Sequence, residues 1–236
     1  MLEWIAYLRP KLNPDLMRYL ILLAPILTLL AACGDKPAPV IDESIYAKVD
    51  PEADARSRMI WQNPGAVMDA MGDIRERVIA DIGAGEGFFA ARLAPIADRV
   101  IAVEIDQKYI NYLDTLRDFN LPKEFRPRLE PRLAKPDDPM LDKSEVDIVL
   151  IVNTFMLIEN KVEYLKKLYP ALRSDGRIVI VDWKKKTTPI GPVKNDRLAI
   201  GELQDMLKAA GFHEVSSDDA TLEYQYIVVA DKKKPE

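Results

Sequence analysis

Three glycines at alternate positions form the clearest candidate ligand-binding loop in the sequence. The run Asp81-Ile82-Gly83-Ala84-Gly85-Glu86-Gly87 follows an apolar stretch at residues 77–82 and precedes apolar residues at helical spacing over residues 87–96. Glycine adopts positive φ angles and lets a ligand approach the backbone closely. A strand, a glycine-rich turn and a helix in this order are typical of nucleotide-binding loops. The residues that we expect to border a ligand here are Asp81, Gly83, Ala84, Gly85 and Gly87.

A second candidate residue, Glu104, ends the next apolar stretch at residues 99–104. A carboxylate at the end of that strand can accept hydrogen bonds from both hydroxyls of a ribose. The charges around the loop favour one class of ligand. Dinucleotide sites have a third glycine where this chain has Phe88, and Glu86 would repel a pyrophosphate at the start of the helix. A sulfonium amino acid with an ammonium group fits this acidic rim better, which leaves a nicotinamide dinucleotide as the less favoured alternative.

Apolar stretches alternate with amphipathic segments over residues 77–230. The strongest apolar stretch, residues 146–153, is typical of a buried parallel strand. The alternation predicts an α/β fold, a doubly wound Rossmann-like sheet that is mostly parallel with one antiparallel edge strand from a terminal hairpin. Ligands bind at the carboxyl ends of the strands in such a sheet. The predicted strands are 77–82, 99–104, 125–133, 146–153, 177–182, 212–217 and 222–230, and the predicted helices are 87–96, 107–119, 161–172 and 199–210.

These motifs together resemble the class I S-adenosylmethionine-dependent methyltransferases, in particular the small-molecule group that includes the ubiquinone and menaquinone enzymes. The glycine run matches the family's first motif, which contacts the methionine part of the cofactor. Val103-Glu104-Ile105-Asp106 matches the second motif, whose acidic residue holds the ribose. Residues 172–183 and the Ala210-Gly211-Phe212 turn resemble later family segments. The resemblance covers residues 55–232 and implies S-adenosylmethionine as cofactor, with Glu104 and Ile105 among its contacts.

Further candidates follow from the ends of the later strands. The position of Asp138 after the third strand resembles the family's adenine-binding loop, and Asn153 closes the fourth strand as another candidate cofactor contact. No histidine follows the fourth strand, although aromatic or histidine residues often occur there in a related bacterial subgroup. The alternatives for these residues are turn formation and ordinary packing. The candidate substrate residues are Trp61 and Gln62 before the first strand, and Asp182 and Trp183 at the end of the fifth.

Composition restricts the chemistry further. The 236-residue chain has a formal net charge of −5, so no basic surplus argues for a nucleic-acid partner. The single cysteine, Cys33, and the single histidine, His213, exclude Cys-rich and His-cluster metal sites. Methyl transfer needs alignment of an acceptor with an activated methyl group, and a general base is optional. We expect a methyltransferase for a small-molecule acceptor, with a catalytically degenerate cofactor-binding module as the alternative.

The N-terminal segment has the features of a bacterial lipoprotein signal. Arg18 precedes an apolar stretch at residues 19–32, which as a helix would be roughly 20 Å long and is too short for the ~30 Å membrane core. The stretch ends in Leu30-Ala31-Ala32-Cys33, which resembles a lipobox with Cys33 as the lipidated residue. We expect a signal peptide at 1–33, with Met17 as the alternative start, a linker at 34–54 and the methyltransferase domain at 55–236. Lipid anchoring in the cell envelope is the expected location, and the cytoplasm is the alternative if the signal is not used.

Overall fold

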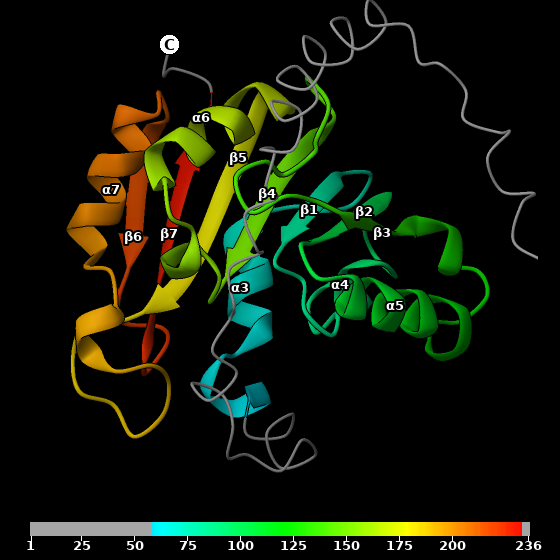
Figure 1. The fold of residues 1–236 in the computed structure, drawn as a ribbon, viewed down its shortest axis with the longest axis horizontal. Coiled ribbons are helices and arrows are strands. Elements are labelled where there is room, and N and C mark those ends of the chain that lie inside the picture. Colours follow the sequence, from blue (N-terminus) through cyan, green and yellow to red (C-terminus); the bar gives the residue numbers. More distant parts are fainter. Residues whose placement is uncertain (1–57, 233–236) are drawn as a thin grey trace, which may run out of the picture. The chain divides into compact units, whose positions relative to one another are not determined.

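The computed structural model describes residues 58–232 (Figure 1). The predicted signal peptide, the lipidation site Cys33 and the predicted linker lie outside the described residues, as do residues 233–236. Within residues 58–232, no helix combines the length and the hydropathy that crossing a bilayer requires.

A seven-stranded sheet in the order β3-β2-β1-β4-β5-β7-β6 forms the centre of the fold. Five neighbouring strands run parallel, and β7 runs antiparallel to both of its neighbours. The predicted doubly wound, mostly parallel sheet is therefore confirmed, and the antiparallel strand of the terminal hairpin lies between β5 and the edge strand β6. The strands are β1 (Val78–Ile82), β2 (Arg99–Glu104), β3 (Leu129–Leu133), β4 (Val146–Val152), β5 (Leu172–Trp183), β6 (His213–Asp218) and β7 (Gln225–Asp231).

Helices cover both faces of the sheet, as Figure 1 shows. The α-helices are α3 (Pro64–Met71), α4 (Ala90–Leu93), α5 (Gln107–Thr115), α6 (Lys161–Ala171) and α7 (Ile200–Ala209). Shorter turns are the π-helix η2 (Leu116–Asn120) and the 3-10 helices η3 (Arg126–Arg128), η4 (Phe155–Leu157) and η5 (Lys194–Asp196). Buried residues of α3, α4 and α5 share one hydrophobic core with the sheet, and buried residues of α6 and α7 share the other.

Successive residues of the central strands point to opposite faces of the sheet and enter the two hydrophobic cores in turn. All seven residues of β4 are buried, with Leu150 and Val152 in the core of α3 and Ile151 in the core of α6. Strands that are buried on both faces form long apolar runs because neither face meets water. This burial fixes the register of β4 between β1 and β5. The register in turn sets how far along the sheet β4 ends and Asn153 begins the next loop.

Most predicted elements differ in their bounds from the structure, and the strand expected at residues 125–133, for example, begins at Leu129. Two other differences have a clear physical cause. The helix expected at residues 87–96 is limited to α4, because Gly87 has a φ of 78° and Pro95 has no N–H with which to continue the helix. The strand expected at residues 177–182 begins at Leu172, and a register shift opposite Val146 and Ile148 accommodates the additional residues. Both differences leave the carboxyl ends of β1 and β5 where the sequence places them.

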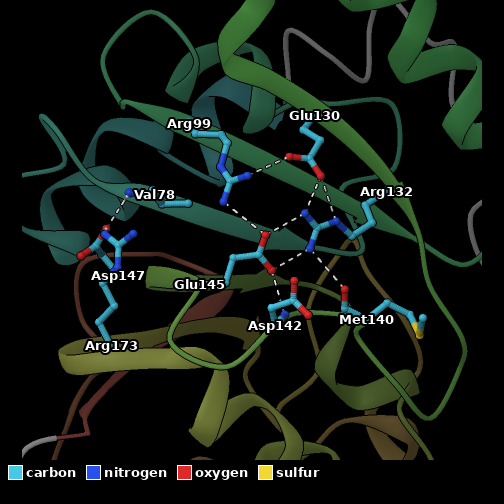
Figure 2. A network of polar contacts seen from close by, with 9 residues as sticks. All are labelled: Val78, Arg99, Glu130, Arg132, Met140, Asp142, Glu145, Asp147 and Arg173. Carbon is cyan, nitrogen blue, oxygen red and sulfur yellow. Dashed lines mark hydrogen bonds and ion pairs between the residues drawn. The ribbon is translucent and has the colours of Figure 1, made fainter.

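Arginine–carboxylate pairs connect β3 with the amino-terminal ends of neighbouring strands (Figure 2). Glu145 accepts hydrogen bonds from Arg132 at 2.8 Å and from Arg99 at 3.2 Å, and these arginines also pair with Glu130. The nearby carboxylate of Asp147 accepts hydrogen bonds from the Val78 N–H and the Arg173 guanidinium in Figure 2. These contacts connect β1 to β4 and β2 to β3, at the end of the sheet remote from the glycine loop.

Candidate active site

The carboxyl ends of four parallel strands bring the main candidates to one edge of the sheet. Asp81 lies near the end of β1, Glu104 ends β2, Asn153 follows β4, and Asp182 is the penultimate residue of β5. The strand order reverses between β1 and β4, which is the switch point at which ligands bind in doubly wound sheets. The sheet therefore assembles residues that are about 100 positions apart in the sequence.

The glycines of the loop have two different roles. Gly83 has a φ of 72°, and a Cβ at this position would lie 2.3 Å from Thr154 Oγ1. Gly87 has a φ of 78°, and its Cβ would lie 2.4 Å from Leu116 Cδ2. At Gly85, by contrast, a Cβ would meet nothing within 4 Å. Gly83 and Gly87 thus allow the loop to pack on the protein, whereas Gly85 borders open space that a ligand can fill. Ala84, between them, is 8% exposed.

Glu104 connects β2 to the glycine loop. Its Oε1 accepts a hydrogen bond from the Gly85 N–H at 2.7 Å, and its Oε2 accepts one from the Ile105 N–H at 3.0 Å. Burial raises the pKa of Glu104, although these backbone hydrogen bonds oppose the shift. A carboxylate offers about four acceptor positions, so capacity remains for two ligand hydroxyls. The side chain of Ile105, which is 37% exposed, lies next to this acceptor.

Asp81 is a buried acid with unused hydrogen-bonding capacity. Its side chain is 3% exposed, and its Oδ2 has no hydrogen-bond partner within residues 58–232. Burial raises the pKa of Asp81 to about 7, with a further contribution from the negative charge of Glu104. Arg58 opposes this shift electrostatically. An unsatisfied buried carboxylate destabilises the folded state, and acids of this kind cluster at functional sites. The position of Asp81 at the switch point is therefore typical of a ligand-binding group.

Asp138 lies in the loop after β3, as predicted, and has a local structural role there. Its Oδ1 accepts a hydrogen bond from the Met140 N–H at 2.8 Å, and its backbone exchanges two hydrogen bonds with Lys135. Its Oδ2 lies 4.0 Å from Lys167 Nζ on α6. These contacts satisfy the turn-forming alternative, and an additional contact of Asp138 with a cofactor stays a prediction.

A chain of buried amides links the lead-in segment to Asn153. Arg58 Nε donates to Gln62 Oε1, Gln62 Nε2 lies 3.5 Å from Gln225 Oε1, and Gln225 Nε2 donates to Asn153 Oδ1. Both glutamines are fully buried. The predicted residues Gln62 and Asn153 are therefore linked through Gln225, which the sequence analysis missed, and Arg58 contacts the outer end of this chain. Arg58 precedes Trp61, the first of the candidate substrate residues, by three positions. Gln225 belongs to β7, whose sequence has no recognisable site motif.

The end of β5 forms the second half of the site. Asp182 is 1% exposed and accepts hydrogen bonds from the Met156 N–H at 3.1 Å and the Trp183 N–H at 2.8 Å. Burial raises the pKa of Asp182 to about 6, against the effect of these two hydrogen bonds. The Trp183 ring packs on Trp61 with a centroid separation of 5.0 Å, and the buried Trp183 Nε1 has no hydrogen-bond partner within the described residues. Of the four predicted substrate residues, Trp61 therefore packs on Trp183, and Asp182 accepts a hydrogen bond from the Trp183 N–H. The fourth, Gln62, instead contacts Gln225, which was not predicted.

Arg197 holds the loop that follows Trp183, and the sequence analysis missed it. The side chain donates hydrogen bonds to the carbonyls of Lys184, Lys186 and Pro192, at 3.0, 2.9 and 2.8 Å. Its guanidinium lies 5.4 Å from the Trp183 ring centroid. Arg197 is only 3% exposed, so the loop over residues 184–197 is fixed from within by one cation.

Comparisons with known proteins agree with this geometry. Residues 80–180 match a family model described as a methyltransferase domain. A probable S-adenosylmethionine-dependent methyltransferase of Mycobacterium tuberculosis is 25% identical over 146 residues, which are 59% of this chain and 50% of the relative. A similarly named protein of Mycolicibacterium smegmatis is 23% identical over 142 residues, 58% of this chain and 52% of that protein. The chain therefore spans about half the length of the curated relatives that it matches.

Solved structures show the same fold. An S-adenosylmethionine-dependent methyltransferase of Aquifex aeolicus aligns with a TM-score of 0.68 and 22% identity over 78% of this chain and 99% of that chain. One of Mesorhizobium loti aligns with a TM-score of 0.59 and 15% identity over 71% of this chain and 96% of that chain. The described residues therefore have the Rossmann-like fold of the class I methyltransferases, and residues 80–180 carry the match to the methyltransferase domain.

Proposed function

We propose that this protein is an S-adenosylmethionine-dependent methyltransferase that acts on a small-molecule acceptor. One structural observation carries the proposal. The buried Asp81 carboxylate, one oxygen of which has no partner among residues 58–232, lies on the strand next to that of Glu104, and Glu104 in turn bonds to Gly85, which borders open space. This arrangement provides negative charge and hydroxyl acceptors, which suits a cationic nucleoside and does not suit a pyrophosphate.

The residues present fit S-adenosylmethionine group by group. Glu104 has the remaining acceptor capacity for the two ribose hydroxyls, and the space beside Gly85 allows the ligand to lie against the loop backbone. Asp81 would balance the positive charges of the amino-acid and sulfonium groups, because an opposite charge stabilises a carboxylate whose pKa burial has raised. Ile105 offers an apolar surface at the end of β2 beside the ribose position.

The bound cofactor supplies an activated methyl group, so the task of the protein is to align the acceptor. We assign this alignment to Asp182 and Trp183 at the end of β5, together with Trp61, which packs on Trp183. The Trp61–Trp183 pair offers an apolar wall, and Trp183 Nε1, which has no partner within residues 58–232, can donate a hydrogen bond to the acceptor. Holding two reactants in line can by itself supply much of a rate acceleration, on the order of 7–11 kcal/mol. We assign no residue as general base.

Thermal unfolding tests the cofactor assignment. S-adenosylhomocysteine, the demethylated product, should raise the melting temperature of the full-length chain, whereas NAD should not. At a hundredfold excess over the dissociation constant, a ligand adds about 2.7 kcal/mol to the free energy of unfolding. No shift with millimolar S-adenosylmethionine or S-adenosylhomocysteine would contradict the proposal. Tight binding without methyl transfer would instead favour the catalytically degenerate alternative.

We propose in addition that the protein is lipid-anchored in a bacterial cell envelope through Cys33. The support is the lipobox-like Leu30-Ala31-Ala32-Cys33 after a short apolar stretch. Acyl chains anchor a protein at about 0.8 kcal/mol per buried methylene, and two or more chains make the anchoring stable. Radioactive palmitate should label the wild-type chain but not Cys33→Ser. Recovery of an uncleaved, unlabelled wild-type chain in the cytosolic fraction would contradict this location.

A further inference from the structure

The buried chain from Arg58 to Asn153 has a fixed hydrogen-bond direction. An arginine guanidinium can only donate hydrogen bonds, whereas a side-chain amide has one accepting oxygen and one donating nitrogen. Because Arg58 donates to Gln62 Oε1, the nitrogen of Gln62 faces Gln225 Oε1, and the nitrogen of Gln225 in turn faces Asn153 Oδ1. The cation at one end therefore determines which way every amide in the chain points.

Because the two glutamines are buried, reversing this hydrogen-bond direction would cost free energy. Gln62 and Gln225 have no exposed surface, so a reversed amide could not exchange its lost partner for water. A reversed Gln225 would place its nitrogen against the nitrogen of Gln62 and its oxygen against Asn153 Oδ1. Two mismatched contacts would follow from a single reversal. The observed polarity is consequently the one in which every contact along the chain pairs a donor with an acceptor.

The free end of the chain is the nitrogen of Asn153. With Oδ1 occupied by Gln225, the amide presents Nδ2 as a donor, and this group makes no hydrogen bond within residues 58–232. Asn153 is half-buried and has a φ of 58°, which turns the backbone out of β4. The next residue, Thr154, packs directly on Gly83 of the glycine loop. The donor therefore lies where the chain from β4 passes the loop.

We propose that Gln62 and Gln225 are positioning residues that hold Asn153 Nδ2 as a hydrogen-bond donor to the carboxylate of the cofactor's amino-acid portion. This inference rests on the proposed cofactor. Asn153 precedes the residue that packs on Gly83 and follows the strand that pairs with the strand of Asp81. This location favours that carboxylate over the ribose, which we assign to Glu104 on β2. A zwitterionic amino-acid group then meets an acid, Asp81, and a neutral donor, Asn153, on adjacent strands.

Two ligands distinguish a change in the orientation of the Asn153 amide from general damage to the fold. S-adenosylhomocysteine contains the amino-acid carboxylate, and 5′-methylthioadenosine lacks the amino-acid portion. In Gln225→Glu the new carboxylate can only accept, so Asn153 must turn its nitrogen toward residue 225 and its oxygen toward the ligand. Gln225→Met keeps the volume and leaves the Asn153 amide without an orienting partner. The matched control is Gln204→Glu on α7, where the same change occurs at a half-buried glutamine that donates a hydrogen bond to Ser217 Oγ.

Calorimetric titration of the full-length chain gives the readout. We expect Gln225→Glu to lower the affinity for S-adenosylhomocysteine about tenfold or more, as for loss of one hydrogen bond to a charged group. Gln225→Met should lower it less, about threefold, because the Asn153 amide can still turn its nitrogen toward the ligand. The affinity for methylthioadenosine should stay within about twofold of wild type in both, and Gln204→Glu should change neither.

Other outcomes overturn the inference. If Gln225→Glu does not fold, Gln225→Met still decides, because an unchanged affinity for S-adenosylhomocysteine in that variant contradicts the orienting role. Equal losses for the two ligands would show that Gln225 only supports the fold. A wild-type chain that binds S-adenosylhomocysteine while both variants match it refutes the inference alone, whereas a wild-type chain that binds neither ligand refutes the proposed function as well.

Discussion

The carboxylates at the two ends of the central strands differ in their ion pairing and in the direction of their pKa shifts. At the amino-terminal end, Glu145 and Asp147 are surrounded by arginines, and hydrogen bonds from Arg132 lower the pKa of Glu145 to about 2. At the carboxyl end, Asp81 and Asp182 form no ion pair within residues 58–232, and burial raises their pKa values to about 7 and about 6. The same sheet thus has acids that are neutralised by the protein and acids that are not.

This difference separates structural from ligand-binding roles. A carboxylate that is fully paired stabilises the fold and has little capacity for another partner. A buried carboxylate without a cation destabilises the folded state at neutral pH, and such groups cluster at functional sites. Asp81 and Glu104 fit the second description and lie at the switch point of the sheet. The following variants test whether the two ends differ as described, from the largest expected effect to the smallest.

Asp81→Asn should stabilise the ligand-free protein at pH 8. The folded-state pKa of Asp81 is raised, so its contribution to stability is fully present below pH 3.8 and is lost as the pH rises through about 7. Removing the acid should add ~1–4 kcal/mol to the free energy of unfolding at pH 8, at 1.36 kcal/mol per pKa unit, and nothing at pH 3.5. Denaturant titration at both pH values measures this, with the exposed Asp98→Asn as control. A loss of stability at pH 8 would mean that Asp81 supports the fold.

Asp147→Ala should destabilise the protein without affecting ligand binding. The change leaves the buried Val78 N–H and the Arg173 guanidinium without their acceptor. We expect a loss of about 2–3 kcal/mol, because removing one partner of a buried pair is costly but the arginine can still reach water. Asp175→Ala, at an exposed position paired with Arg77, should cost less than about 1 kcal/mol. Equal effects of the two variants would remove the distinction between buried and exposed pairs at this end.

Glu145→Gln should abolish part of the acid sensitivity of the fold. The folded-state pKa of Glu145 is lowered from 4.5 to about 2, so its contribution is present above pH 4.5 and is lost as the pH falls through about 2. The variant should lose about 1–2 kcal/mol at pH 7, and the difference from wild type should disappear near pH 2. Chemical unfolding at a series of pH values checks this. A constant difference across the series would show that ion pairing is not the cause.

Glu104→Ala should lower the affinity for S-adenosylhomocysteine at least about tenfold, because two hydrogen bonds from ribose hydroxyls are lost at ~1.5–3 kcal/mol each, partly offset by water. Folding should change by about 1 kcal/mol, since the Gly85 N–H can then bond to water. Calorimetric titration measures the affinity, and Glu104→Gln, which retains one acceptor oxygen, should give an intermediate loss. Unchanged affinity in the alanine variant would place the ribose elsewhere.

Much of the fold and half of the site could be predicted from local patterns. The order of strand, glycine loop and helix locates Asp81 and Glu104, because parallel strands bring their carboxyl ends to one edge. The contact of Gln225 with Asn153 could not be predicted, since it joins residues 72 positions apart through a strand order that the sequence pattern leaves open. The same is true of Thr154 against Gly83 and of Arg197 within its loop. These contacts depend on tertiary packing and have no periodic signal.

The pH dependence of S-adenosylhomocysteine binding tests the central claim most directly. If Asp81 is reserved for the positive charge of the ligand, the affinity of wild type should increase about tenfold between pH 6 and pH 8, as a group with a pKa of about 7 ionises. Asp81→Asn should bind more weakly at pH 8, with a flat profile over the same range. Parallel profiles in the two proteins, or a wild-type affinity that does not change with pH, would contradict the account.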